Sequence, residues 1–232
     1  MNRSTVAVIL PALNEISCVE KVVEEFLRDG TRVIVVDNGS NDGTGQAAQA
    51  AGAEVVYEKT RGYGSACLAG LSYLASSPPQ IVAFADCDGS LDPQDLSALI
   101  APIESGNADL VLGRRARVER GALPMHQRFG NAIACYSLRI LYGVTVNDIP
   151  PYRAVRWFFI TRLGLSERTY GFPIETIALT AKRGGNVEEV DVSYRCRFSG
   201  ESKVTGSLSA SLRAGVTMIA LPIKLRFRRL AA

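Results

Sequence analysis

Short aliphatic runs alternate with helix-like segments through the first half of the chain, and this alternation constrains the fold more than any other feature. The run "RVIVVD" at residues 32–37 is typical, because only apolar, mostly β-branched residues lie between its charged ends. Such runs suit strands that are buried on both faces, as in a parallel sheet covered by helices. The sequence therefore predicts an α/β fold with a mostly parallel, Rossmann-like central sheet flanked by helices.

The expected elements follow from these runs and from the turn residues between them. Strands are expected at residues 5–10, 31–36, 53–57, 81–85, 109–112 and 187–194. Helices are expected at residues 17–30, 44–51, 65–75, 93–105, 128–142 and 175–183. The spacing of Ser17 and Glu20 predicts a capping box at the start of the first helix. Because no repeat or low-complexity linker interrupts the 232 residues, we predict a single domain over residues 1–232.

The two halves of the chain carry opposite charge. Residues 1–112 hold 6 Lys and Arg against 15 Asp and Glu, whereas residues 113–232 hold 20 against 8. A basic half favours an anionic partner. No interleaving of aromatic and basic residues and no nucleic-acid-reading motif accompanies the charge, so we expect no nucleic-acid partner.

The cysteines and the hydropathy pattern bear on where the protein works. Five widely spaced cysteines without a C-x-x-C pair predict free thiols in a cytoplasmic protein. The first apolar run breaks at Asn14 without a cleavage site, so we read a strand there and not a signal peptide. No apolar stretch reaches the roughly 18 residues that a membrane span needs.

Two carboxylates follow the apolar run at residues 81–85. Asp86 and Asp88 are separated by one residue, so in extended chain both side chains point to the same face. Such neighbours repel each other unless a cation joins them, and hard oxygen ligands without nearby His favour Mg²⁺ or Mn²⁺. Capping of the next helix is the alternative role, and Asp92 before Pro93 fills it better.

Polar clusters also follow the other expected strands, where an open parallel sheet binds its ligands. Asp37 begins "DNGSNDGT" and could hold the amide edge of a nucleobase, although a plain polar turn is the alternative. The stretch "TRGYGSA" offers Gly62 and Gly64 but lacks the third glycine of a dinucleotide fingerprint. "GRRAR" is expected to follow the fifth strand as a basic cluster.

Further candidates lie in the basic half. Arg197 and Lys203 bracket a glycine-containing loop that could grip a diphosphate, since guanidinium groups suit phosphate oxygens. Asp148 in "NDIPPYRAVR" and Glu175 in "YGFPIE" are acidic residues in irregular stretches typical of site loops.

Six motifs in this order resemble those of family 2 glycosyltransferases, and especially the dolichol- or polyprenyl-phosphate hexosyltransferases. They are "VILPALNE", "VVDNGSNDGT", "RGYGSACLAG", "FADCDGSLDP", "DIPPYRAVR" and "RFSGESKVTG", spread over roughly residues 5–206. The resemblance implies a GT-A fold, a nucleotide-sugar donor linked to UDP or GDP, a divalent metal and an inverting transfer. It also implies a donor-binding half at residues 1–112 and an acceptor-binding half at residues 113–232.

The resemblance assigns roles residue by residue. Donor binding falls to Pro11, Ala12, Glu15, Asp37, Gly62, Gly64, Asp86, Arg197 and Lys203. The metal falls to Asp86 and Asp88. Acceptor binding falls to Arg114, Arg128, Asn131 and Arg153, and Asp148 and Arg153 match the motif that closes the catalytic pocket.

The nature of the acceptor decides whether a catalytic base is needed. A polyprenyl phosphate is already anionic and needs no strong base, whereas a soluble hydroxyl acceptor would need Asp148 first or Glu175 second. Two departures from the family stand out. Ser90 replaces the glutamine that many relatives carry, and a basic, apolar end, "LPIKLRFRRLAA", replaces their membrane helices.

The basic end of the chain is expected either to contact the cytoplasmic face of a membrane peripherally or to form a solvated helix.

Two other classes of function are compatible with single motifs. "VAFADCDGSL" alone also resembles a haloacid-dehalogenase-type phosphatase, and a nucleotide-binding protein without turnover is the remaining alternative.

Overall fold

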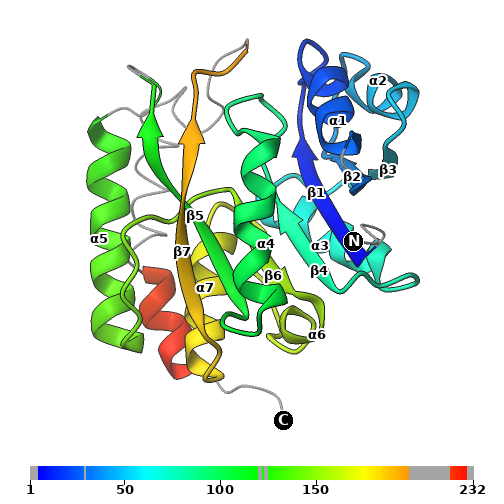
Figure 1. Ribbon diagram of the computed structural model, residues 1–232. Coiled ribbons are helices and arrows are strands. Elements are labelled where there is room, and N and C mark those ends of the chain that lie inside the picture. The colour runs from blue at the N-terminus through cyan, green and yellow to red at the C-terminus, as the bar shows by residue number, and fades with distance from the viewer. Residues whose placement is uncertain (1–4, 29, 120–121, 123–124, 199–219, 229–232) are drawn as a thin grey trace.

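The computed structural model describes residues 5–28, 30–119, 122, 125–198 and 220–228. Its named strands form a seven-stranded sheet in the order β3-β2-β1-β4-β6-β5-β7 (Figure 1). The strands are β1 Val6–Ala12, β2 Arg32–Asp37, β3 Glu54–Tyr57, β4 Ile81–Phe84, β5 Leu110–Val118, β6 Arg153–Arg156 and β7 Val187–Tyr194. All neighbours pair in parallel except β6, which is antiparallel to β4 and β5. The predicted α/β class with a mostly parallel sheet is confirmed.

Except for α6, which was not predicted, the named helices lie close to their predicted places. They are α1 Val19–Leu27, α2 Thr44–Ala50, α3 Tyr63–Leu74, α4 Leu96–Glu104, α5 Met125–Tyr142, α6 Trp157–Ile160 and α7 Phe172–Lys182. Residues 220–227, the terminal helix, are also helical. No helix in the described part of the chain is both long and apolar enough to cross a bilayer.

Helix starts test the sequence signals directly. The capping box predicted at Ser17 is wrong, because α1 begins after Cys18 and no side chain caps it. The cap predicted at Asp92 is confirmed, since its carboxylate accepts a hydrogen bond from Gln94 N at 3.1 Å ahead of a 3-10 turn, Pro93–Asp95.

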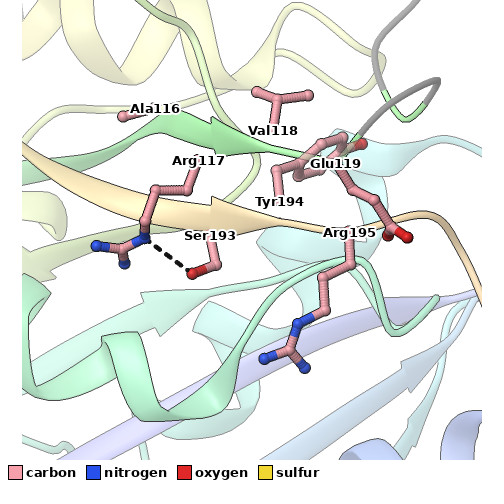
Figure 2. A pocket seen from close by; sticks show the side chains of 7 residues that line it. All are labelled: Ala116, Arg117, Val118, Glu119, Ser193, Tyr194 and Arg195. Carbon is pink, nitrogen blue, oxygen red and sulfur yellow. Dashed lines mark hydrogen bonds between the residues drawn. The ribbon is translucent and has the colours of Figure 1, made fainter.

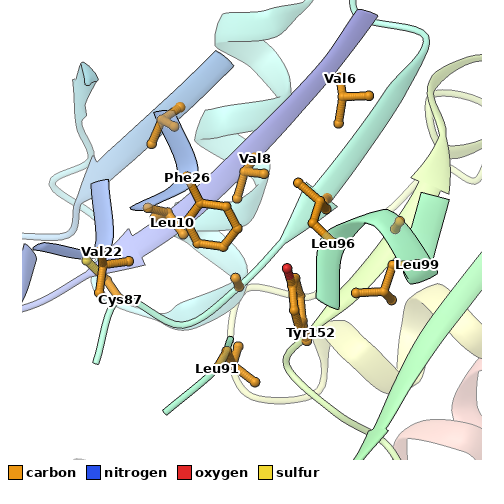
Figure 3. Close-up of a cluster of buried hydrophobic side chains, with 14 of the residues drawn as sticks. Val6, Val8, Leu10, Val22, Phe26, Cys87, Leu91, Leu96, Leu99 and Tyr152 are labelled. Carbon is orange, nitrogen blue, oxygen red and sulfur yellow. The ribbon is translucent and has the colours of Figure 1, made fainter. Parts of the chain in front are cut away.

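The sheet separates two apolar cores. Alternate residues of β1 point to opposite faces, so Val8 and Leu10 pack with α1, α2 and α4, whereas Ala7 and Ile9 pack with α3, α5 and α7. Figure 3 shows the first core, where Phe26 of α1 lies beside Val8 and Leu10. Because both faces are covered, the strands can be apolar throughout.

The short strand β6 was not predicted, and it decides where the strand ends lie. Because it runs antiparallel to both β4 and β5, those two strands point in the same direction. β5 also continues to Val118, so "GRRAR" lies within the strand and not after it, which corrects the predicted boundary. The carboxyl ends of every named strand except β6 therefore share one edge of the sheet.

The strand order reverses between β1 and β4. β1 is followed in sequence by β2 and β3 on one side, while β4 lies on its other side. A reversal of this kind leaves a crevice beyond the carboxyl ends of the two strands, where ligands bind in open α/β sheets. Asp86 and Asp88 follow β4 at this point.

Candidate active site

Asp86 and Asp88 form an electrostatically strained pair at the end of β4. Asp88 is 2% exposed, and its Oδ1 accepts a hydrogen bond from Ser90 N at 2.9 Å. Burial, followed by the charge of Asp88, raises the pKa of Asp86 to about 7. Two carboxylates in such surroundings favour a cation or a proton between them.

The residues present fit a divalent metal of the magnesium type. Asp88 Oδ2 is buried and accepts no hydrogen bond of good geometry from the described residues. Those residues hold no cluster of three or more His, Cys, Asp or Glu side chains, so no complete protein cage is formed. Mg²⁺ and Mn²⁺ commonly bind through one or two carboxylates and complete their shell with water and substrate phosphates. Asp86 and Asp88 would be the protein ligands.

The end of β7 is fixed to the loop that carries the two carboxylates. Tyr194 forms an antiparallel bridge with Leu91, and Arg195 N donates to Ser90 O at 2.8 Å. Ser90, which departs from the family pattern, is fully buried. Its backbone N–H donates to Asp88, and its carbonyl accepts from Arg195. The acidic and basic halves of the chain therefore meet at the candidate metal site.

Phe198 makes a further contact between the segment after β7 and the loop that carries the two carboxylates. Its backbone N–H donates to Asp88 O at 3.2 Å, and Lys21 Nζ lies 4.2 Å above its ring. Gly89 has a φ of +77°, and a Cβ there would lie 2.3 Å from the Phe198 ring. Glycine is required at this position both by its conformation and by the close approach.

Arg197, which was predicted to grip the donor diphosphate, forms an ion pair with Asp88. Its Nη2 lies 3.0 Å from Asp88 Oδ2, with the side chains 28% and 3% exposed. Among the positive charges around Asp86, Arg197 is the one that most strongly lowers its pKa against the effect of burial. Lys203, its predicted partner, lies outside the described residues.

Asp37 ends β2 at a second hollow. Its buried carboxylate accepts a hydrogen bond from Ser40 N at 2.7 Å, and a Cβ on Gly45 would lie 2.7 Å from it. A cavity of about 350 Å³ opens beside Asp37, Ser40 and Tyr57. This is the size and place expected for part of a nucleoside pocket.

Asn38 is a site residue that the sequence analysis missed. Its backbone N–H donates to Ala12 O at 2.9 Å, and its amide group donates to the carbonyls of Glu58 and Thr60. Its Oδ1 accepts from Gly62 N at 2.7 Å. Its side-chain amide thus joins the ends of β2 and β3 to the loop before α3, and its backbone bonds the end of β1. Its place directly after Asp37 was the available signal.

The loop after β1 lies against the carboxylate loop. Pro11 and Ala12 end β1, half-buried and buried respectively, and Glu15 is half-buried beyond them. Cys18 donates from Sγ to Cys87 O at 3.1 Å, which brings this loop beside the residue between the two aspartates. The segment that follows these predicted donor-binding residues is therefore close to the candidate metal site.

Gly62 and Gly64 are required by packing within the chain. A Cβ on Gly62 would lie 2.2 Å from Arg168 O, and one on Gly64 would lie 2.1 Å from Glu167 O. Ser65 N also donates to Arg168 O at 2.9 Å. The close approach that these glycines allow is to residues 167–169, which differs from the predicted approach to a nucleoside.

Asp148 is held by strong donors. Arg115 binds it through Nε at 2.8 Å, Nη2 at 2.6 Å and its backbone N–H at 3.0 Å, and Ile149 N adds a bond of 2.8 Å. The Arg115 and Asp148 side chains are only 10% and 8% exposed. Asn131, a predicted acceptor residue, instead accepts from Ile149 N at 2.9 Å and supports the same turn. These four bonds occupy both oxygens of the Asp148 carboxylate.

Glu175, the second candidate base, is equally engaged. It is 1% exposed and accepts bonds from Ser166 N, Glu167 N and the Ser166 hydroxyl. Arg228, directly after the terminal helix, adds an ion pair at 2.8 Å. Glu175 therefore joins α7 to the terminal helix and to the loop at residues 166–167.

Arg153 is fully buried among aromatic rings. Its guanidinium lies 5.0 Å from the Phe84 ring centre, 5.3 Å from that of Phe172 and 5.9 Å from that of Tyr63. Its charge lowers the pKa of Asp86 against the effect of burial. Because Arg153 has no exposed surface, its charge acts on Asp86 from the protein interior. This differs from the direct acceptor contact predicted for it.

The remaining predicted acceptor residues lie on the surface. Arg114 pairs with Asp191 directly across β5 and β7, with Nη2 2.6 Å from Oδ1. Arg128 is exposed on α5. The structure does not bring either of them to the carboxylate pair through a described contact.

An open hollow of about 640 Å³ lies along the ends of β5 and β7. Figure 2 shows Arg117, Tyr194 and Arg195 around it, with Arg117 donating to Ser193. Two of its lining residues, Tyr194 and Arg195, also contact Leu91 and Ser90 in the loop that carries the two carboxylates.

Known proteins resemble this chain over most of its length. The family described as glycosyl transferase family 2 matches residues 7–165. An uncharacterized glycosyltransferase of Mycobacterium tuberculosis is 42% identical over 214 residues, which are 92% of this chain and 96% of the relative. The undecaprenyl-phosphate mannosyltransferase of Micrococcus luteus is 31% identical, covering 91% and 92%.

A solved structure supports the same assignment. The glucosyl-3-phosphoglycerate synthase of Mycobacterium tuberculosis, in complex with Mn²⁺, UDP and phosphoglyceric acid, superposes with a TM-score of 0.75 at 26% identity. The match covers 97% of this chain and 79% of that one. It confirms the predicted GT-A fold, and the family match excludes the phosphatase alternative. The chain belongs to glycosyltransferase family 2.

Proposed function

We propose that this enzyme transfers a hexose, with inversion, from a UDP- or GDP-linked donor to a polyprenyl phosphate, and that it depends on Mg²⁺ or Mn²⁺. The donor assignment is supported by the hollow beside Asp37 and by the carboxylate pair at the strand-order reversal. It is also supported by the Mn²⁺ and UDP bound to the structurally similar synthase.

The residues divide the work of donor binding. Asp37 would hold the nucleobase, Asp86 and Asp88 would hold the metal, and Arg197 would contact the diphosphate. A bound divalent ion would neutralise charge that develops on the leaving diphosphate as the glycosidic bond breaks. Arg153 would keep Asp86 ionised from behind, where its own charge is desolvated.

One observation carries the choice of acceptor. Both candidate bases are fully engaged, Asp148 by Arg115 and Glu175 by Arg228 and backbone donors. A hydroxyl acceptor would need a free base within reach, whereas a phosphate oxygen is already a nucleophilic anion. The engaged carboxylates therefore favour a phosphate acceptor over a soluble hydroxyl. The mannosyltransferase relative, whose name specifies undecaprenyl phosphate, supports the same choice.

A membrane contact fits this acceptor. The terminal helix buries Leu221 and Leu225 and leaves Ile223 48% and Phe227 82% exposed, beside the exposed cations Lys224 and Arg226. Apolar side chains flanked by cations suit the surface of an anionic bilayer. Arg228, which the sequence placed in this basic group, is instead used by Glu175.

The direct test compares three acceptors with a panel of UDP- and GDP-linked hexoses and Mn²⁺. We expect sugar transfer to a short-chain polyprenyl phosphate and no transfer to the matching polyprenol or to phosphoglyceric acid. The readouts are the lipid-linked sugar and the released nucleoside diphosphate. Transfer to the polyprenol would refute the phosphate argument, and transfer to phosphoglyceric acid alone would refute the lipid. Absence of turnover with every donor would favour a nucleotide-binding protein.

A further inference from the structure

Arg197 lies where a cation is expected. Its Nη2 is 3.0 Å from Asp88 Oδ2, the buried oxygen that no well-formed hydrogen bond satisfies. The same guanidinium acts electrostatically on Asp86. One positive group therefore serves both carboxylates in the chain without metal.

A divalent ion and this guanidinium would compete for Asp88. A metal binds a carboxylate oxygen at about 2.1 Å, so it would lie at most about 5 Å from the Arg197 nitrogen on the same oxygen. The Asp88 side chain is only 3% exposed, so little water can screen the repulsion between them. The ion pair seen here and a bound metal are alternatives.

The backbone limits how Arg197 can move away. Arg195 N bonds Ser90 O, and Phe198 N bonds Asp88 O, so the chain is held to the carboxylate loop on both sides of Arg197. Phe198 also packs on Gly89. Rotation of the Arg197 side chain would then be sufficient to release Asp88, and it would leave the guanidinium beside the metal site.

We propose that Arg197 is a built-in substitute for the metal, which a divalent ion must displace from Asp88 and which then becomes available to the donor diphosphate. This inference rests on the metal site of the proposed function. It makes Arg197 a positioning residue with two opposite effects, because it weakens metal binding before the donor arrives and strengthens donor binding afterwards.

The first test measures Mn²⁺ affinity without nucleotide, by calorimetry on the full chain. Arg197→Gln should bind Mn²⁺ roughly tenfold more tightly than wild type, since one nearby positive charge is removed. Arg197→Lys, which keeps the charge, should fall between them. Arg195→Gln is the matched control, because it removes the same charge two residues away from a side chain paired with Asp92. Its Mn²⁺ affinity should equal that of wild type.

The second test measures nucleotide affinity, on which the substitution should have the opposite effect. With saturating Mn²⁺, Arg197→Gln should bind UDP or GDP roughly tenfold more weakly than wild type. A residue that only grips diphosphate would show this loss without the gain in metal affinity.

Three results would overturn the inference. They are an unchanged or weaker Mn²⁺ affinity in Arg197→Gln, an equal gain in Arg195→Gln, and unchanged nucleotide affinity in Arg197→Gln. Mn²⁺ binding that survives Asp88→Asn, or that is absent in every variant, would instead refute the metal site itself. Thermal unfolding of each variant verifies that the fold is retained.

Discussion

Four carboxylates near the sheet edge differ in how their charge is satisfied. Asp148 accepts four bonds from Arg115 and backbone donors, and Glu175 accepts four from Arg228, backbone donors and the Ser166 hydroxyl. The charge of Asp88 instead raises the pKa of Asp86, and Arg197 pairs with Asp88 while its charge lowers the pKa of Asp86. An acid with a full set of donors stabilises the fold, whereas an acid that lacks them can bind a ligand. This contrast separates structural from chemical roles more reliably than acidity alone.

Asp88→Asn should abolish the metal function and preserve the fold. The amide keeps the shape of the side chain but removes the charge that would hold the ion, so Mn²⁺-dependent turnover should fall by about a hundredfold or more. Asp92→Asn is the control, because Asp92 caps a turn in the same loop. Turnover within a fewfold of wild type in Asp88→Asn would contradict the proposed mechanism.

The pKa of Asp86 predicts how metal binding depends on pH. Burial and Asp88 raise this pKa to about 7, so below pH 7 the carboxyl must lose a proton before it can bind an ion. Mn²⁺ affinity should be nearly constant above pH 7.5 and fall by up to about tenfold per pH unit below 6.5. Calorimetry at several pH values measures it, and Asp86→Asn should remove the dependence. A flat affinity from pH 6 to 8 would count against the assignment.

At the scale of elements, the strong periodic signals predicted the fold and local packing decided the rest. Continuous apolar runs identified β1, β2 and β4 because both faces of the sheet are covered. β6 was missed because its four residues have arginine at each end, and only Ala154 and Val155 look apolar. The packing of residues 167–169 against Gly62 and Gly64 was not predicted, because those residues lie about 100 positions away in the sequence.

This packing predicts a steric cost at Gly62. Gly62→Ala should destabilise the protein by about 3 kcal/mol, because positive φ adds to a clash with Arg168 O. Gly106→Ala is the matched control, since Gly106 also has a positive φ but open space around it, and it should cost about 1 kcal/mol. Urea unfolding gives both values. Equal losses would show that backbone conformation alone explains Gly62.

At the scale of the whole molecule, the acidic and basic halves of the chain contribute different residues to the candidate site. The acidic half supplies Asp86 and Asp88, the basic half supplies Arg197, and the two meet where residues 194–198 bind residues 88–91. The sequence assigned Arg197 to the donor diphosphate and did not predict that it would pair directly with Asp88. Such long-range contacts depend on the strand order, which local patterns do not encode.

The terminal helix should direct the molecule to anionic lipid. Reversing both exposed cations, in Lys224→Glu with Arg226→Glu, should reduce co-sedimentation with phosphatidylglycerol vesicles by about tenfold or more. Lys59→Glu, with Lys59 exposed on the acidic half, should have little effect. Equal sedimentation of the double variant and wild type would remove the case for this docking surface.

The burial of Arg153 gives the terminal helix a further consequence. Arg228 is bound by Glu175 on α7, and Phe172 at the start of α7 lies against Arg153, whose charge acts on Asp86. Lys182, at the other end of α7, donates to the carbonyls of Leu225 and Arg226. The series consists of an ion pair, hydrogen bonds, a cation–ring contact and the action of the Arg153 charge on Asp86. If the terminal helix binds a membrane surface, these contacts would therefore keep the carboxylate pair at a fixed distance from that surface.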